Sequence, residues 1–166
     1  MFLILDWPVF VDDLTRLSAA AILGGAIGLE RELNGHFAGL RTHMMVAIGC
    51  AAFVVAGLAI AGEQQEAVTR VIQGVAAGIG FLGAGTILKL DDQQKIKGLT
   101  TASSIWLAAA LGTVAGLAEY ALAAAAACVA LFVLAVLRPV EKAFARRFAP
   151  PKQQNRTDTP TDAEGQ

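Results

Sequence analysis

Charged side chains are scarce in this chain, and long stretches lack them altogether. Asp, Glu, Lys and Arg make up 16% of the 166 residues, against about 25% in ordinary soluble domains. A helix of roughly 20 uncharged residues can cross the apolar core of a bilayer, which is about 30 Å thick. The pattern therefore favours a membrane protein over a soluble helical bundle. Four uncharged runs have about this length: Met44–Gly62, Val71–Leu88, Gly98–Ala118 and Tyr120–Leu137.

The residues that build catalytic, metal and nucleic-acid sites are also few. The two cysteines, Cys50 and Cys128, lack C-x-x-C or metal-ligand spacing, so we expect them to serve in packing. No set of residues has the spacing of a nucleophile–base pair or a zinc site, and no basic–aromatic module is present. We therefore expect neither an enzyme nor a nucleic-acid-binding protein. We expect no cofactor, and leave only an association with Mg²⁺ open.

A fifth span is predicted from a shorter uncharged run, Leu17–Leu29. As a helix this run is only about 20 Å long, too short to cross a bilayer alone. Extended to Leu14–Leu33, it crosses with Arg16 at one membrane face and the acidic and basic residues 30–32 at the other. The sequence thus predicts an all-α integral membrane protein. Its five transmembrane helices are expected over residues 14–33, 42–62, 68–89, 99–118 and 120–138.

The two ends of the chain are expected to lie outside the bundle. Residues 1–13 lack the basic start of a signal peptide, so we expect an interfacial segment anchored by Trp7 and Phe10. Residues 139–166 are basic at first and then polar, which predicts a cytoplasmic tail that ends in disorder. The basic segment Arg138–Lys152 could hold anionic lipid. We favour the alternative that its charges are an ordinary topology signal.

The distribution of basic residues predicts the orientation of the five spans. Of the 13 Lys and Arg residues, all except Arg16 and Arg70 fall on the side that holds the first–second loop, the third–fourth loop and the C-terminal tail. Cytoplasmic loops carry an excess of Lys and Arg. We therefore expect the N-terminus outside and the C-terminus in the cytoplasm of a bacterial inner membrane.

Glycines are abundant in the third span, where GVAAGIGFLGAG (Gly74–Gly85) contains a G-x-G-x-x-G pattern. A dinucleotide site would need a preceding strand and an acidic residue about 20 positions later in a soluble unit, so that interpretation fails. Small residues instead allow close helix packing in lipid. A functional break in the helix that exposes backbone groups to an ion is the alternative.

A helical wheel places the small residues of the third span on two arcs and its aliphatic residues, including Val75 and Ile79, on another. Two small-residue arcs predict neighbours on two sides, so we expect this helix at the centre of the bundle and the aliphatic arc against lipid. The glycines expected to pack helices together are Gly24, Gly28, Gly74, Gly78, Gly80, Gly112 and Gly116.

Polar residues gather at the predicted cytoplasmic face, in GLERE, GLRTH and KGLTTASSIW. Charges are common at membrane edges, but a first span this short favours a structured role for Glu30, Arg31 and Arg41. The start of the fourth span can attract an anion, which could be Glu30, Glu32, a phosphate or a lipid headgroup. Glu30 and Glu32 are also weak candidates for a metal ion, since they lie about 160° apart on a helix. On the other side, Arg70 and Gln73 are expected to face the bundle.

These motifs resemble those of a known family. GLERE, AGLRTHMMVAIG, GFLGAGTIL and KGLTTASSIWLAAALG, in this order and spacing, are similar to the membrane domain of the MgtC/SapB family. The resemblance runs from about Leu14 to Arg138. The residues that match the family's motifs, and that it marks as candidates for function, are Glu30, Arg31, Glu32, Gly39, Arg41, Thr42, Gly83, Gly85, Lys97, Thr100, Thr101, Ser103 and Ser104.

The resemblance implies a bacterial inner-membrane protein linked to growth at low magnesium and, in pathogens, to virulence and survival inside macrophages. It implies a regulator that acts through membrane partners such as the ATP synthase, and homo-oligomers are also expected. The alternative is a small, oligomeric transporter or channel for magnesium or another cation. Larger family members carry a soluble C-terminal domain of the ACT type, and this chain has only a short tail there. It therefore looks like the short SapB-type members.

Overall fold

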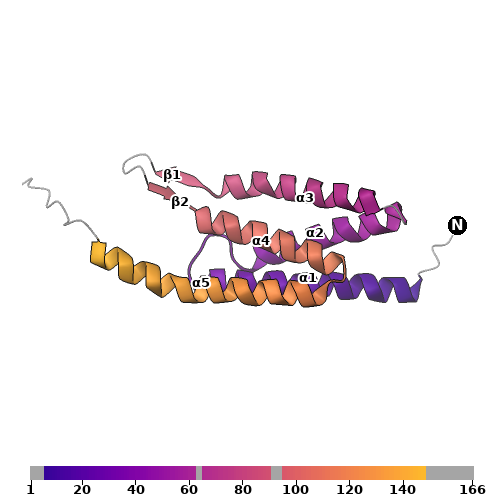
Figure 1. Ribbon diagram of the computed structural model, residues 1–166, viewed down its shortest axis with the longest axis horizontal. Helices are drawn as coiled ribbons and strands as arrows, with labels where there is room; N and C mark the ends of the chain where they lie inside the picture. The colour runs from indigo at the N-terminus through magenta and orange to yellow at the C-terminus, as the bar shows by residue number, and fades with distance from the viewer. Residues whose placement is uncertain (1–5, 63–64, 91–94, 149–166) are drawn as a thin grey trace, which may run out of the picture.

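The computed structural model describes residues 6–62, 65–90 and 95–148. It contains five helices and one two-stranded antiparallel hairpin (Figure 1). The helices run roughly along the long axis, and α1 begins at the end opposite to the one where α5 finishes. The elements are α1 (Trp7–Leu33), α2 (Leu40–Ala61), α3 (Gln65–Gly85), β1 (Leu88–Leu90), β2 (Lys95–Lys97), α4 (Leu99–Gly116) and α5 (Tyr120–Phe148).

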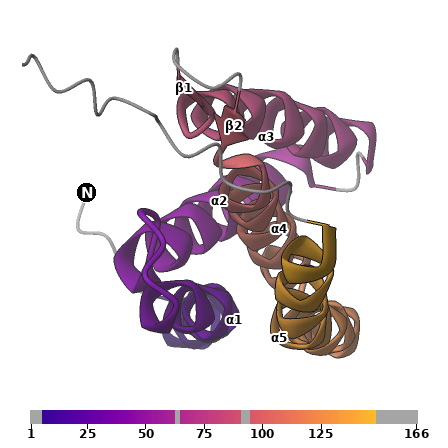
Figure 2. The ribbon, with the colours of Figure 1, turned by 90° about the vertical axis from the view of Figure 1, so that its left-hand side faces the viewer.

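Helices α2 and α4 form the centre of the bundle. Seen from one end, α3 lies on one side of this pair, and α1 and α5 lie on the other (Figure 2). Over the most apolar 18 residues of each helix, 56% of the residues are buried in α4 and 33% in α2, against 11% in α3 and in α5. The core is built from small and medium side chains, among them Ala47, Val54, Ala108 and Leu111. Small side chains let the helices approach closely, so packing contacts can hold them together where water is absent.

Four glycines bring the backbones of α1, α2 and α4 together. A Cβ added at Gly24 would lie 2.6 Å from the carbonyl oxygen of His43, and one at Gly28 would lie 2.8 Å from the Cα of Leu40. On the other side of α2, a Cβ at Gly112 would collide with the carbonyl of Ala47. Gly116 is similarly close to Ala51 and Val54. No larger residue fits these crossings unless a backbone moves.

The third helix does not lie at the centre, contrary to the expectation from its glycines. Gly74, Gly78 and Gly80 are exposed, and an added Cβ at any of them would meet no atom within 4 Å. The aliphatic arc points inward instead: Ile79 is buried and, with Val75, packs against the core. The helical wheel separates small from aliphatic residues, but it does not show which side faces the neighbouring helices. In a membrane either kind of surface can face lipid.

Several helix limits differ from the predicted ones. Helix α1 begins at Trp7, where Pro8 suits the first turn of a helix, so part of the predicted interfacial segment is helical. Helix α5 continues past Pro139 to Phe148, so the start of the predicted tail is helical too. Helix α3 ends at Gly85, and a hairpin that we did not predict follows it. Residues 1–5 and 149–166, which include most of the predicted tail, lie outside the described residues.

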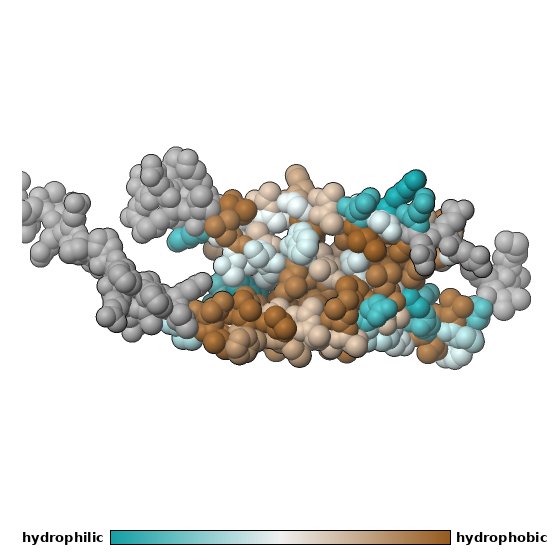
Figure 3. Space-filling view, viewed as in Figure 1, coloured by the Kyte–Doolittle hydropathy of each residue, from teal (hydrophilic) through white to brown (hydrophobic). Residues whose placement is uncertain are grey.

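Four helices are long and apolar enough to cross a membrane: α2, α3, α4 and α5. Among the described helices α1 does not meet this criterion, since charged residues lie near both of its ends. Large apolar side chains are exposed on the outside of the bundle, for example Ile22, Phe53, Phe81 and Phe132. Figure 3 shows apolar residues over the middle of the molecule and hydrophilic residues nearer its ends. Such a surface fits lipid rather than water, and the chain is a membrane protein.

Candidate functional site

The four motifs meet at the end of the bundle that carries the α1–α2 loop and the hairpin. The ends of α1 and α3 and the starts of α2 and α4 surround a cavity of about 830 Å³, which we call the motif cavity. The predicted candidates that line it come from all four motifs. They are Arg31, Thr42, Gly85, Lys97, Thr100 and Thr101.

Arg31 is the most deeply buried charged residue of this site. Its side chain is 3% exposed, and its Nη2 donates to Thr101 Oγ1 at 3.2 Å. Its Nε is buried and has no hydrogen-bond partner. A guanidinium has five N–H donors, and a buried charge is costly unless it is paired. Arg31 therefore lines the motif cavity and keeps one buried donor, Nε, without a partner.

Gly98 fixes the start of α4 beside the end of α3. It has φ of 98°, and an added Cβ would collide with the carbonyl of Thr86. Gly98 has no side chain that could cap α4, and its carbonyl oxygen accepts a hydrogen bond of 2.8 Å from Ala102 N. The amides of the first turn therefore carry the partial positive charge of a helix N-terminus next to Thr100 and Thr101.

His43 and Ser104 form a buried hydrogen-bonded pair between α2 and α4. His43 is fully buried, and its Nδ1 lies 2.8 Å from Gly39 O. A carbonyl oxygen can only accept, so Nδ1 carries a proton. His43 Nε2 lies 3.0 Å from Ser104 Oγ, which also lies 2.9 Å from Thr101 O. With a neutral imidazole, the single hydroxyl proton of Ser104 is donated to His43 Nε2 or to Thr101 O, not to both.

Glu30 and Glu32 bond to different parts of the structure. Glu32 Oε2 accepts a hydrogen bond of 2.8 Å from Leu40 N and so caps the start of α2. Glu30 Oε1 accepts from Asn34 Nδ2 at 2.5 Å, while Glu30 Oε2 is buried without a partner. Among the described residues, no group of three or more His, Cys, Asp or Glu side chains could hold a metal ion. Neither carboxylate lines the motif cavity.

The electrostatic environment of the cavity is positive. Burial lowers the pKa of the His36 imidazole, the charges of Arg31 and Arg138 lower it further, and Glu30 partly offsets them. His36 lies in the α1–α2 loop and also lines the cavity. The charges of Lys97 and Arg31 make the cavity suited to an anion, because none of the described lining residues is acidic.

Other candidates lie outside the motif cavity. Arg41 is exposed, Ser103 is exposed and donates to Leu99 O, and Gly83 is buried against Ala102. Arg70 and Gln73 are also exposed, which contradicts the expectation that they face the bundle. The cause is the inverted orientation of α3, whose glycine-bearing side points outward.

The places of the two histidines were not predicted from the sequence. His43 falls in a stripe with Ala47, Cys50 and Val54, all of which are buried on α2. This spacing of three and four residues is a helical face and could have indicated burial of His43. For His36, which lies in an irregular loop, no periodic signal exists.

Comparison with protein families agrees with the motifs quoted above. The model of the MgtC family matches residues 17–143, three quarters of the chain and nearly all of its helical part. The chain belongs to the MgtC family. The matched region includes every residue of the motif cavity, so the cavity is built from the portion that the family shares. No solved structure matches the chain.

Individual members of the MgtC family are similar over most of this chain. Protein SrpB of Synechococcus elongatus is 45% identical over 111 residues, which cover 61% of each protein. Protein MgtC of Brucella abortus is 40% identical over 134 residues, 81% of this chain and 55% of that protein. The putative magnesium transporter YhiD of Escherichia coli is 42% identical over 127 residues, 73% of this chain and 58% of that protein. The matched part thus spans between half and two thirds of the length of these relatives.

Proposed function

We propose that the chain is an accessory or regulatory protein of the bacterial inner membrane, linked to magnesium limitation, that acts by binding another membrane protein. The link to magnesium rests on family membership and on the relative named as a putative magnesium transporter. The five-span topology, with α1 crossing and the C-terminus in the cytoplasm, is part of the proposal. It is supported by the opposite ends at which α1 begins and α5 finishes (Figure 1) and by the charge distribution.

This proposal rests mainly on the small and aromatic residues that are exposed on the outer face of α3. Ala77, Phe81 and Ala84 are exposed there, and Phe81 is 84% exposed. Small residues on a membrane helix permit close approach of a second helix. Arg70, exposed on the same face, adds a charge that is costly in lipid and is stabilised by a polar partner. The face therefore fits a helix of another membrane protein.

A transporter or channel for magnesium or another cation is the second candidate, favoured by the name of the YhiD relative. The interior of the single chain gives it little support. Ser104 and Thr113 are buried on α4, about 13 Å apart along the helix. The residues buried between them are apolar or glycine: Ile105, Ala108, Ala109, Leu111 and Gly112. A water-filled path through one chain would have to cross this apolar layer.

Site-specific disruption of the α3 face tests the partner proposal. Ala77→Phe places a large side chain at the centre of the face, whereas Gly80→Phe places one on an exposed part of α3 outside it. After mild solubilisation from magnesium-starved cells, we expect the unaltered chain and Gly80→Phe to co-purify with the same membrane protein in a fixed ratio. Ala77→Phe should lose it. Recovery of monomer alone from the unaltered chain, or equal loss in both variants, would contradict the proposal.

A further inference from the structure

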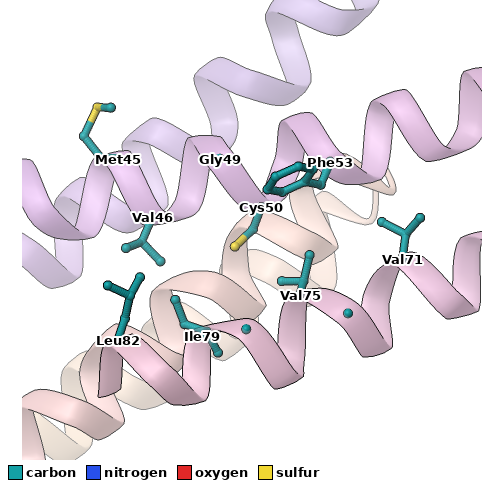
Figure 4. Close-up of a pocket in the computed structure, with 11 residues that line it drawn as sticks. Met45, Val46, Gly49, Cys50, Phe53, Val71, Val75, Ile79 and Leu82 are labelled. Carbon is teal, nitrogen blue, oxygen red and sulfur yellow. The ribbon is translucent and has the colours of Figure 1, made fainter. Parts of the chain in front are cut away.

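A second cavity lies next to the motif cavity. It lies between α2 and α3, has a volume of about 600 Å³, and is almost wholly apolar; we call it the α2–α3 groove. Figure 4 shows Val46 and Cys50 of α2 pointing towards Val75 and Ile79 of α3 across it. Gly74 and Gly78 also line the groove and leave open space above their backbones.

The groove and the motif cavity are adjacent. Met45, Val46 and Leu82 line both of them. A polar, positively charged cavity and an apolar groove therefore meet at these three residues. Along α2 and α3 the apolar part extends roughly 12 to 16 Å at 1.5 Å per residue, which suits the upper part of an acyl chain.

The motif cavity has donors that the protein leaves unused. Arg31 is only 3% exposed, lines the cavity, and has a buried Nε without a hydrogen-bond partner. Lys97 is exposed at the cavity wall. Thr100, Thr101 and the amides of the first turn of α4 lie beside them. Such a set of donors, with a helix N-terminus among them, is suited to the oxygens of a phosphate group.

The protein's own carboxylates do not fill this place. Glu32 caps α2, Glu30 Oε1 bonds to Asn34, and neither carboxylate lines the motif cavity. Of the anions considered for the start of α4, this leaves an external one. We propose that the chain binds an anionic phospholipid, with the headgroup phosphate at Arg31, Lys97 and the start of α4, and an acyl chain in the α2–α3 groove.

The charge of the site selects the lipid. The motif cavity presents Arg31 and Lys97, and its described lining residues include no acid. A lipid with a net negative headgroup is therefore bound more tightly than a zwitterionic lipid with the same acyl chains. Hydrogen bonds to charged groups contribute to affinity. An acyl chain is out of water in the bilayer as well as in the groove, so the groove adds packing contacts and fixes the direction of the chain.

Native mass spectrometry of the full chain in detergent tests the proposal with three probes: phosphatidylglycerol, phosphatidylcholine with the same acyl chains, and inorganic phosphate. We expect phosphatidylglycerol to bind at least about tenfold more tightly than phosphatidylcholine. Equal affinity for the two lipids, or no retained lipid, would overturn the proposal. Binding of inorganic phosphate without the lipid would also overturn it, and would identify a site for a soluble anion instead.

Two pairs of variants separate the two halves of the site. Lys97→Gln should weaken phosphatidylglycerol binding by about tenfold, whereas Arg41→Gln removes an exposed charge at the same end and outside the cavity. Gly78→Leu fills the groove and should weaken the lipid but not phosphate, whereas Gly80→Leu lies outside the groove. Equal effects within either pair would contradict the assignment. Arg31→Gln is informative only where gel filtration shows a folded protein, so the other variants carry the test.

Discussion

At the scale of single residues, Gly112 shows how closely α2 and α4 approach. A Cβ at this position would overlap the backbone of Ala47, whereas Gly80 faces open space. Overpacking a well-filled core costs about 1–3 kcal/mol. We expect Gly112→Val to lower the temperature at which the detergent-solubilised protein loses its monodisperse gel-filtration peak, and Gly80→Val to leave it nearly unchanged. Equal effects would show that the close crossing is not a source of stability.

Ser104 and Ser103 are neighbours on α4 in different settings. Ser104 is buried and bonds to His43, while Ser103 is exposed and bonds only within its own helix. Removal of the Ser104 hydroxyl leaves His43 Nε2 buried without a partner, at a cost of about 1–3 kcal/mol. Ser104→Ala should therefore destabilise the protein in the same gel-filtration assay, and Ser103→Ala should not. The interpretation would be wrong if the two variants behaved alike.

His36 makes the stability depend on pH in a defined direction. Its pKa in the folded protein is lowered by burial and by Arg31 and Arg138, and is partly restored by Glu30. As the pH falls below about 6.5, His36 therefore binds a proton in the unfolded chain at a higher pH than in the folded protein. The stability is full above that pH and decreases as the pH falls towards the folded pKa. Between pH 7.5 and pH 5.5 we expect a smaller loss of thermal stability in His36→Gln than in the unaltered chain. An unchanged pH dependence would contradict this.

At the scale of elements, Gly98 holds the start of α4 against Thr86, the residue that follows α3. Its positive φ and its contact with Thr86 leave no room for a side chain. We expect Gly98→Ala to destabilise the protein by about 1–3 kcal/mol and to disturb the motif cavity. Gly49→Ala, at a helical glycine with open space around it, should be neutral or slightly stabilising. Thermal unfolding of both variants, followed by circular dichroism, measures the difference. A neutral Gly98→Ala would contradict this account of the joint.

The sequence predicted the elements better than their arrangement. The uncharged runs located four of the helices, and the motif GLERE located the end of α1. The hairpin was missed because the uncharged run ends at Leu88, and the mostly charged and polar residues 89–97 contain no Gly or Pro that would indicate a turn. The position of α3 could not be derived, since small and aliphatic faces are equally compatible with lipid and with a neighbouring helix.

The candidate site was predicted in its composition but not in its geometry. The motifs named Arg31, Lys97 and Thr101, and the structure places all three at one cavity. Spacing along the chain could not show that Glu30 and Glu32 bond elsewhere, because those bonds depend on how the α1–α2 loop folds back. Arg70 was predicted to face the bundle because it shares a helical face with Gly74 and Gly78. That face is exposed in the structure.

At the scale of the whole molecule, the five-span topology predicts which ends share a compartment. In a background with Cys50→Ala and Cys128→Ala, single cysteines would replace Asp6, Phe37 and Glu66, all exposed positions. We expect a membrane-impermeant maleimide to label positions 6 and 66 in spheroplasts and position 37 only in inverted vesicles. Labelling of positions 6 and 37 from the same side would show that α1 does not cross.

Magnesium flux through the purified protein distinguishes most directly between an accessory protein and a transporter. The folded chain, reconstituted in liposomes that contain phosphatidylglycerol, would be loaded with a magnesium-sensitive dye and given an inward magnesium gradient. The apolar layer between Ser104 and Thr113 predicts uptake no faster than in protein-free liposomes. Saturable magnesium uptake above that level, lost in Arg31→Gln protein that remains folded, would contradict the proposed function.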